Sequence, residues 1–200
     1  MKAIGSVKEN LSIENRISIT PDTTKKLVDL KLVVFLEKNY GKHLGITDED
    51  YTKQGARLLS SVDEVFKKSD IILKANCPSK EEIDLIKNKS ILIGQFNPAL
   101  NKEALNKLIK KEVKIFSLEL LPRITRAQSM DVLSSQANLA GYRAVIESIY
   151  EFGKVVPMMM TAAGTITPAK VLVIGAGVAG LQAIATAKRL GALVFATDVR

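Results

Sequence analysis

Short apolar runs alternate with segments of helical period along the first 120 residues. Each run is continuous rather than alternating polar with apolar positions, which is typical of strands buried on both faces. We expect such strands at residues 2–7, 32–36, 70–74, 90–94 and 113–118. Helices with recognisable N-caps lie between the runs, and we expect them at residues 23–30, 49–54, 80–87 and 102–110. Strands that alternate with helices predict a parallel sheet covered by helices, and therefore an α/β fold.

The pattern changes after Pro122. Residues 123–131 are polar and fit neither period, so we expect a loop that ends in a helix cap. A long helix is predicted over residues 132–152. Gly141 in its middle costs about 1 kcal/mol relative to alanine, which close packing against a neighbour could offset. We therefore divide the chain into an N-terminal Rossmann-like lobe, a linking loop and helix, and the beginning of a second domain, at residues 1–125, 126–156 and 157–200.

A glycine pattern, GAGVAG at 175–180, directly follows an apolar strand at 170–174. A helix at 181–190 and a second strand at 193–197 complete a β-α-β unit. In this setting the first glycine permits a tight turn, the second removes a side chain near phosphate, and the third lets helix and strand pack closely. The helix amides and dipole then face an anion. We expect an incomplete Rossmann domain whose dinucleotide is bound by Gly175, Gly177, Val178, Ala179 and Gly180.

Asp198 follows the second strand and bears on the choice of cofactor. In this position a carboxylate accepts hydrogen bonds from the adenosine ribose hydroxyls. A 2′-phosphate about 4 Å away would be repelled by about 4 kcal/mol at an effective dielectric constant near 20. NAD(H) is therefore favoured over NADP(H). Arg200, two residues on, could soften this preference and is itself a candidate contact of the cofactor.

Residues 171–187 carry no charge and reach the lower edge of membrane-spanning length. Three glycines in their middle and a β-branched start favour a buried strand, turn and helix instead. We expect no membrane insertion by this chain. Residues 1–8 are interrupted by glycine and lysine too early for a secretory apolar core, so we expect no export.

The net charge of +8, from 29 basic and 21 acidic residues, raises the question of nucleic acid. The lysines are interleaved with acidic residues, and aromatic residues make up only 5% of the chain. This distribution favours solvated helix faces over a nucleic-acid surface. The single cysteine, Cys77, and the single histidine, His43, cannot supply the ligands of a zinc site.

Two long segments carry a family resemblance. RITRAQSMDVLSSQANLAGYRAVIE at 123–147 and PMMMTAAGTITPAKVLVIGAGVAGLQAIATAKRLGALVFATDVR at 157–200 resemble the NAD(H)-binding alpha subunit of proton-translocating NAD(P) transhydrogenases. The N-terminal part is also similar to alanine dehydrogenases, with which it shares Arg16 and the following Thr20-Pro21. The resemblance covers essentially all 200 residues. It implies an oxidoreductase subunit that gives hydride from NADH to NADP⁺ on a partner subunit.

The resemblance also implies partners and site residues. The partners would be an NADP(H)-binding beta subunit, a membrane-spanning component that moves protons, and a second full-length alpha subunit in a homodimer. The location would be cytoplasmic, peripheral to the inner membrane through those partners. Arg123, Gln128 and Asp131 would orient the dihydronicotinamide, with Ser134 one helical turn further. The alternative is structural, with Asp131 as a helix N-cap and Arg123 as a surface ion-pair partner.

Two other functions stay open. Alanine dehydrogenases use an arginine, a lysine and a histidine on the amino acid, and Arg16 and Lys74 match the first two. Residues 93–98, where the histidine would lie, hold no ionisable side chain, and amine oxidation needs a base. Arg16 and Lys74 are then expected to be ion-pair partners. The other alternative is a non-catalytic nucleotide-binding fragment.

Two further expectations concern packing. With only one strand, helix and strand of the second domain present, we expect an exposed sheet edge and an isolated chain that needs a complementing fragment. We expect Met158, Met159 and Met160 to be flexible filler beneath the cofactor lobe.

Overall fold

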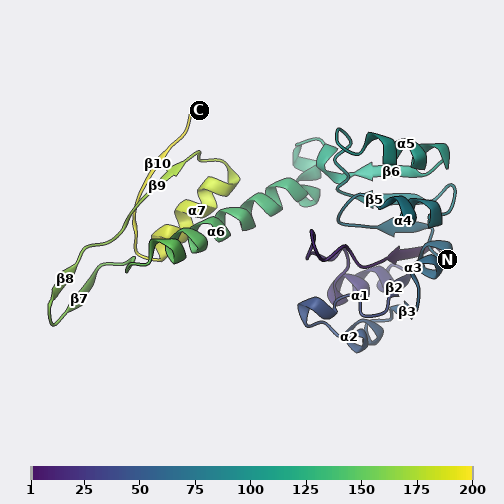
Figure 1. Ribbon diagram of the computed structural model, residues 1–200, viewed down its shortest axis with the longest axis horizontal. Coiled ribbons are helices and arrows are strands. Elements are labelled where there is room, and N and C mark those ends of the chain that lie inside the picture. The colour runs from purple at the N-terminus through teal and green to yellow at the C-terminus, as the bar shows by residue number, and fades with distance from the viewer. Residues whose placement is uncertain (1, 200) are drawn as a thin grey trace. The chain divides into compact units, whose positions relative to one another are not determined.

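A computed structural model describes residues 2–199 of the chain (Figure 1). The chain divides into two compact units, residues 1–122 and residues 123–200. Each unit has its own sheet and its own apolar core.

Unit 1 is built on a six-stranded sheet in the order β3-β2-β1-β4-β5-β6. Every neighbouring pair is parallel, and Ile4 at the centre pairs with Val34 on one side and Ile71 on the other. The strands are β1 (Ala3–Ser6), β2 (Val33–Glu37), β3 (Arg57–Leu59), β4 (Ile71–Leu73), β5 (Ile91–Gly94) and β6 (Lys114–Ser117).

Helices connect the strands of unit 1, since parallel neighbours require crossovers. They are α1 (Pro21–Asp29), α2 (Asp48–Lys53), α3 (Val62–Lys68), α4 (Lys80–Leu85) and α5 (Lys102–Lys110), with short 3₁₀ turns η1 (Lys42–Leu44) and η2 (Leu118–Leu120). The first four begin at a side chain that accepts a backbone amide: Thr20, Thr47, Ser61 and Ser79. These hydroxyls satisfy amides that have no acceptor within the helix.

Apolar side chains pack on both faces of this sheet. One cluster includes Leu36 and Tyr51 and is covered by α1 and α2. The other includes Phe66, Leu92 and Leu108 and is covered by α3, α4 and α5. Since successive strand residues point to opposite faces, burial on both sides explains why the runs are apolar without alternation. The α/β prediction for this unit is confirmed.

Most predicted elements of unit 1 are present within a few residues of their expected bounds. All five expected strands and all four expected helices form. The structure adds β3 and α3, which the sequence pattern did not predict. β3 has only three residues and begins with an exposed arginine, so its apolar run is too short to recognise.

Unit 2 begins with a 3₁₀ helix, η3 (Thr125–Met130), in the segment expected to be a loop. It continues with α6 (Val132–Phe152), β7 (Met159–Thr161), β8 (Gly164–Ile166), β9 (Lys170–Ile174), α7 (Val178–Arg189) and β10 (Leu193–Thr197). β9 and β10 are parallel and joined through α7, which is the predicted β-α-β unit. α6 and both strands have their predicted bounds, whereas α7 begins three residues earlier than expected.

The core of unit 2 lies where α6 and α7 meet the strands. Val145, Ala183 and Ala187 are buried there, and Val171, Val173 and Val194 of the strands pack against them. The other face of the strand pair is open in the described residues, with Leu172 and Ile174 exposed to 64% and 82%.

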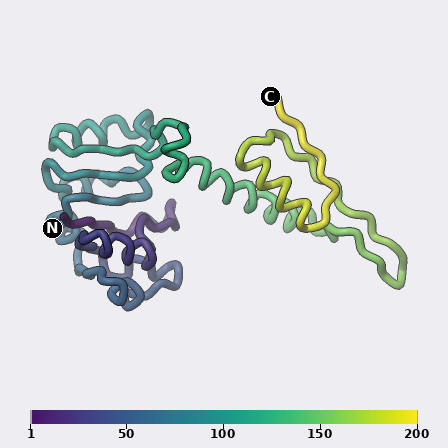
Figure 2. The backbone as a smooth tube through the Cα atoms, turned by 180° about the vertical axis from the view of Figure 1, so that it is seen from behind, coloured from purple at the N-terminus to yellow at the C-terminus, as the bar shows by residue number. Residues whose placement is uncertain are grey.

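An antiparallel hairpin, β7–β8, was not predicted. It extends away from the β9–β10 pair in both views (Figures 1 and 2). The expectation that the methionines are buried filler is wrong, because Met158, Met159 and Met160 are exposed to 63%, 44% and 85% along this hairpin. A two-stranded ribbon has no second layer to cover its side chains.

Between residues 2 and 199, no helix has both the length and the apolar character needed to cross a membrane.

Candidate dinucleotide-binding site

The glycine turn joins β9 to α7 in the way the fingerprint requires. Gly175 has a φ of +96°, a conformation that side chains rarely adopt. A Cβ placed on Gly180 would overlap the carbonyl oxygen of Gly175 and lie 2.8 Å from its carbonyl carbon. The first turn of α7 therefore packs directly on the glycine turn.

The N-terminus of α7 is suited to an anion. Gly177 is its N-cap and contributes no side-chain hydrogen bond, so no side chain covers the amides of the first turn. Those amides have no acceptor within the helix, and the helix dipole adds positive potential. Val178 and Ala179 are the first two helical residues. This geometry fits a pyrophosphate.

A groove of about 840 Å³ opens over this helix end. It is within the size range of ligand pockets. Arg123 from the polar segment lines it and brings a positive charge to the anion site. The remaining walls come from α6, the glycine turn and α7: Leu133, Ser134, Ala137, Ile174, Gly175, Gly177, Val178, Ala179, Gly180 and Leu181.

Asp198 lies at the same edge of the sheet, just after β10. Its Oδ2 accepts a hydrogen bond from the backbone amide of Ala176 at 2.6 Å. The carboxylate is thereby fixed beside the glycine turn, at the carboxyl ends of two neighbouring parallel strands. This is where a ribose lies in dinucleotide folds. Arg200, the other predicted contact, lies outside the described residues.

A second groove, of about 650 Å³, lies between η3 and the N-terminal turns of α6. It shares Ser134 and Val178 with the first groove, so the two hollows adjoin. Its lining is mostly polar: Gln128, Ser129, Asp131, Ser134, Ser135, Asn138, Leu139 and Val178. The predicted residues Gln128, Asp131 and Ser134 are therefore brought together here, and Arg123 lies in the adjoining groove.

Asp131 and Ser134 make two hydrogen bonds with each other. Asp131 Oδ1 accepts the Ser134 amide at 2.9 Å, and Oδ2 accepts the Ser134 hydroxyl at 2.7 Å. The first bond makes Asp131 the N-cap of α6, as the structural alternative predicted. These two bonds, and to a smaller extent the charge of Arg123, lower the pKa of Asp131. Because the hydroxyl proton of Ser134 is committed to Asp131, its oxygen can only accept from a ligand.

Sequence reasoning missed two polar residues of the second groove, Ser135 and Asn138. Asn138 lies four residues after Ser134 on α6, and side chains at this spacing share one face of a helix. Extending the helical face from Ser134 by one turn would have found it.

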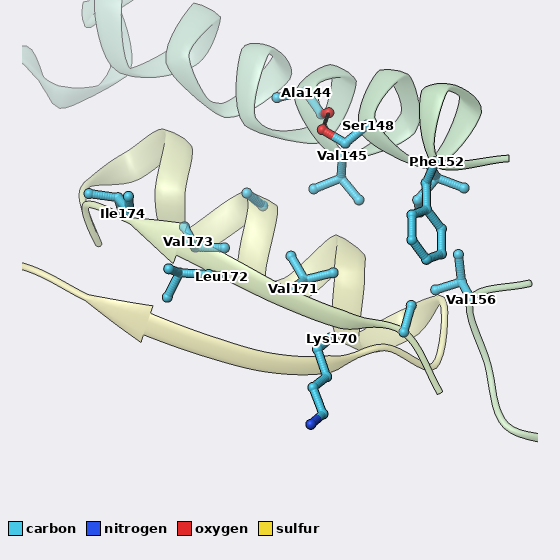
Figure 3. Close-up of a pocket in the computed structure, with 13 residues that line it drawn as sticks. Ala144, Val145, Ser148, Phe152, Val156, Lys170, Val171, Leu172, Val173 and Ile174 are labelled. Atoms are coloured by element: carbon cyan, nitrogen blue, oxygen red, sulfur yellow. Dashed lines mark hydrogen bonds between the residues drawn. The ribbon is translucent and has the colours of Figure 1, made fainter. Parts of the chain in front are cut away.

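A third hollow, of about 420 Å³, lies between α6 and β9 (Figure 3). Its walls are almost entirely apolar, with Val145, Phe152, Val171 and Val173 among them. The hydroxyl of Ser148 donates to the carbonyl of Ala144 within its own helix. This hollow therefore presents almost no polar chemistry.

In unit 1, Arg16 and Lys74 are both ion-paired. Arg16 forms a bidentate pair with Glu14, with distances of 2.8 and 2.6 Å from its Nε and Nη2. Lys74 is buried, 2.7 Å from Glu82 and 3.3 Å from Glu9. Their basic groups are therefore already neutralised by internal carboxylates.

The segment at 93–98 offers no general base. Gln95 lies 3.4 Å from an Arg16 nitrogen. The amide of Phe96 donates to Glu119 at 2.9 Å, which holds the segment against η2. Neutral amides in this position cannot accept a proton from an amine.

Comparison with known proteins agrees with this architecture. Residues 5–140 match the family described as Alanine dehydrogenase/PNT, N-terminal domain, and residues 144–200 match its C-terminal domain. A transhydrogenase structure from Sinorhizobium meliloti has a TM-score of 0.95 and 48% identity, covering 100% of this chain and 59% of that one.

Curated relatives include both branches of the family. A segment of NAD(P) transhydrogenase subunit alpha from Rhodospirillum rubrum is 48% identical over 198 residues, 96% of this chain and 52% of the relative. The alanine dehydrogenase of Methanococcus maripaludis is 31% identical over 201 residues, 98% of this chain and 53% of the relative. The chain thus spans about half the length of these curated relatives. It belongs to the alanine dehydrogenase/PNT family and is similar over nearly its whole length to the NAD(P) transhydrogenase alpha subunits of that family.

Proposed function

We propose that this chain supplies the NAD(H)-binding part of a proton-translocating transhydrogenase, in which NADH gives hydride to NADP⁺ on a partner subunit. The observation that carries the proposal is the junction of the two grooves at Ser134 and Val178. One groove has the chemistry for a pyrophosphate and the other the chemistry for an amide-bearing ring. A dinucleotide needs both, side by side.

The α7 groove would hold the adenosine diphosphate half. The amides of the first turn of α7 would bind the pyrophosphate, together with the guanidinium of Arg123. The carboxylate of Asp198 would accept from the ribose hydroxyls and disfavour a 2′-phosphate. Bound NADH would supply the hydride.

The polar groove would fix the orientation of the nicotinamide. Ser134 Oγ presents only lone pairs, so it would accept from the carboxamide NH₂ group. Gln128 offers both a donor and an acceptor, and would bind the remaining side of the carboxamide. Asp131 would act by holding the hydroxyl of Ser134 in place.

Direct hydride transfer requires little from the protein beyond positioning. The carbon–hydrogen bond of NADH breaks and a new one forms on NADP⁺, giving NAD⁺ and NADPH, so no proton is exchanged in this step. Holding the two rings in contact supplies most of the rate enhancement. This suits a chain whose unit 1 has neutral amides in place of a base and whose Arg16 and Lys74 are ion-paired.

The partners follow from the same proposal. An NADP(H)-binding beta subunit would face the polar groove, a membrane-spanning component would couple the reaction to proton movement, and the full-length alpha subunit would form a homodimer. Relatives named as subunit alpha support this assignment. Attachment to the inner membrane would come through these partners.

Two measurements test the proposal. Titration of the chain with NADH by calorimetry should show saturable binding that is tighter than for NADPH. NADH deuterated at C4 should then pass its label to NADP⁺ when the NADP(H)-binding subunit is added. Absence of NADH binding would contradict the proposal. Binding without label transfer would favour the non-catalytic alternative.

Gln128→Asn tests the orienting groove separately. Shortening the side chain by one methylene moves the amide without removing it. We expect hydride transfer to slow more than NADH binding weakens. Equal losses in both would count against an orienting role for Gln128. Alanine with NAD⁺ should give no reduction, which checks the amino-acid dehydrogenase alternative.

A further inference from the structure

The helices α6 and α7 approach each other most tightly at one glycine. A Cβ placed on Gly141 would overlap the carbonyl oxygen of Ala179, and would lie 2.8 Å from its carbonyl carbon and 3.0 Å from its Cα. All three atoms belong to the backbone, so no side-chain rotamer can relieve the overlap. Any residue larger than glycine must move one helix relative to the other.

The contact falls at the ligand-binding end of α7. Ala179 is in the first turn of the helix and lines the pyrophosphate groove. Its neighbour Gly180 packs on Gly175, so the first turn and the glycine turn move together. The rest of the helix interface lies further along, where Val145 packs with Ala183 and Ala187.

Gly141 also relates to the other groove through α6. It follows Ser134 by seven residues, which is about two helical turns, so both residues lie on nearly the same helix face. Ser134 lines both grooves, and Ala137 between them lines the pyrophosphate groove. The crossing at Gly141 therefore fixes how far the hydroxyl of Ser134 lies from the amides of α7.

We propose that Gly141 is a positioning residue: it sets the spacing between the nicotinamide groove on α6 and the pyrophosphate cradle on α7 so that one dinucleotide reaches both. The inference rests on the proposed function, because it takes NADH to be the ligand that spans the grooves. A side chain at position 141 would separate the two groups without altering either of them.

The test compares a ligand that spans both grooves with one that uses a single groove. NADH should contact α6 and α7, whereas ADP should contact only the α7 cradle and Asp198. We expect Gly141→Ala to weaken NADH binding about tenfold or more, since small misplacements of binding groups are costly, and to weaken ADP binding by less than about threefold. Both affinities are measured by calorimetry on the whole chain.

Val145→Ala is the matched control. It loosens the same helix interface one turn further along, by removing volume rather than adding it. It should lower thermal stability while leaving the ratio of the NADH and ADP affinities unchanged. In ligand-free protein, Gly141→Ala should shift the backbone amide resonances of residues 178–181 more than those of residues 186–189, and Val145→Ala should do the reverse.

The outcomes separate the inference from the proposed function. Wild-type chain that does not bind NADH contradicts the proposed function. Wild-type chain that binds NADH, with equal NADH and ADP losses or no loss in Gly141→Ala, overturns the role of Gly141 alone. If Gly141→Ala fails to fold while Val145→Ala folds, the glycine serves the fold of unit 2 and the positioning role is overturned.

Discussion

The carboxylate of Asp131 binds Ser134 twice, accepting its backbone amide at 2.9 Å and its side-chain hydroxyl at 2.7 Å. The first bond starts α6, and the second decides which way the hydroxyl proton points. One residue thus combines a structural and a ligand-binding task, and the two interpretations of Asp131 describe two different oxygen atoms.

The two tasks can be separated by substitution. Asp131→Ala should lower the free energy of unfolding by about 1 kcal/mol through loss of the cap. Asp131→Asn should keep the cap, because asparagine is an equally good N-cap, and yet slow hydride transfer, because its amide group no longer holds the hydroxyl proton of Ser134 in the same way. Urea unfolding and deuteride transfer measure the two effects. Wild-type transfer rates in Asp131→Asn would contradict the second role.

Ser134→Ala removes the acceptor while leaving the amide that Asp131 caps. The loss of one hydrogen bond, worth about 0.5–1.5 kcal/mol, should weaken NADH binding roughly twofold to tenfold. ADP, which lacks the nicotinamide, should bind with unchanged affinity. Calorimetric titration of both ligands checks this expectation, and a parallel loss for ADP would place Ser134 outside the nicotinamide groove.

Gly180→Ala should destabilise unit 2, because the added methyl group would overlap the carbonyl of Gly175. Forcing extra volume into a tight contact costs about 1–3 kcal/mol. Hydrogen exchange of the amides in α7 and β9 should accelerate, while exchange in unit 1 stays unchanged. Gly153→Ala offers a control, since a Cβ there has open space except for one carbonyl 4.0 Å away.

Asp198→Asn should relax the choice between cofactors. Removing the negative charge removes the repulsion of a 2′-phosphate, which is about 4 kcal/mol at most. We expect the ratio of NADH to NADPH affinity to fall at least about tenfold, mostly through tighter NADPH binding. An unchanged ratio would show that another group selects the cofactor.

Glu9 gives unit 1 a predictable response to pH. Burial raises the pKa of its carboxyl above the ordinary 4.5, against the opposing effect of Lys74. The folded state therefore binds this proton more strongly than the unfolded state does. The stability due to Glu9 is complete below pH 4.5 and is lost as pH rises through the higher folded pKa.

Glu9→Gln removes this dependence. The free energy of unfolding of Glu9→Gln relative to wild type should therefore increase as the pH is raised from about 4 towards 7. Urea unfolding monitored by circular dichroism across this range measures the difference. A constant offset at every pH would contradict the expected titration of Glu9.

Most of the fold follows from local pattern. Continuous apolar runs predicted the central strands because burial on both faces requires them, and Thr20 and Ser79 marked their helices as caps. The glycine spacing predicted the turn at Gly175, whose positive φ few other residues tolerate. These features depend on residues near each other in sequence, where propensity and periodicity are informative.

The missed features depend on distant contacts or on too few residues. β3 is held by its pairing with β2 rather than by its own composition. The hairpin carries Met159 and Met160 outward, although their apolar character suggested burial. The overlap of Gly141 with Ala179 could be anticipated as close packing, but its location at the ligand-binding end of α7 required the three-dimensional structure.

The order of strands in unit 1 gives the ion pair of Lys74 a wider meaning. The winding of the chain reverses between β1 and β4, and α/β sheets commonly bind ligands outside the carboxyl ends of such strands. Glu9, which follows β1, accepts the amide of Ala75, which follows β4, at 2.7 Å. At its topological switch point, unit 1 thus carries a built-in counterion, and an anionic ligand arriving there would compete with a carboxylate that is covalently part of the chain.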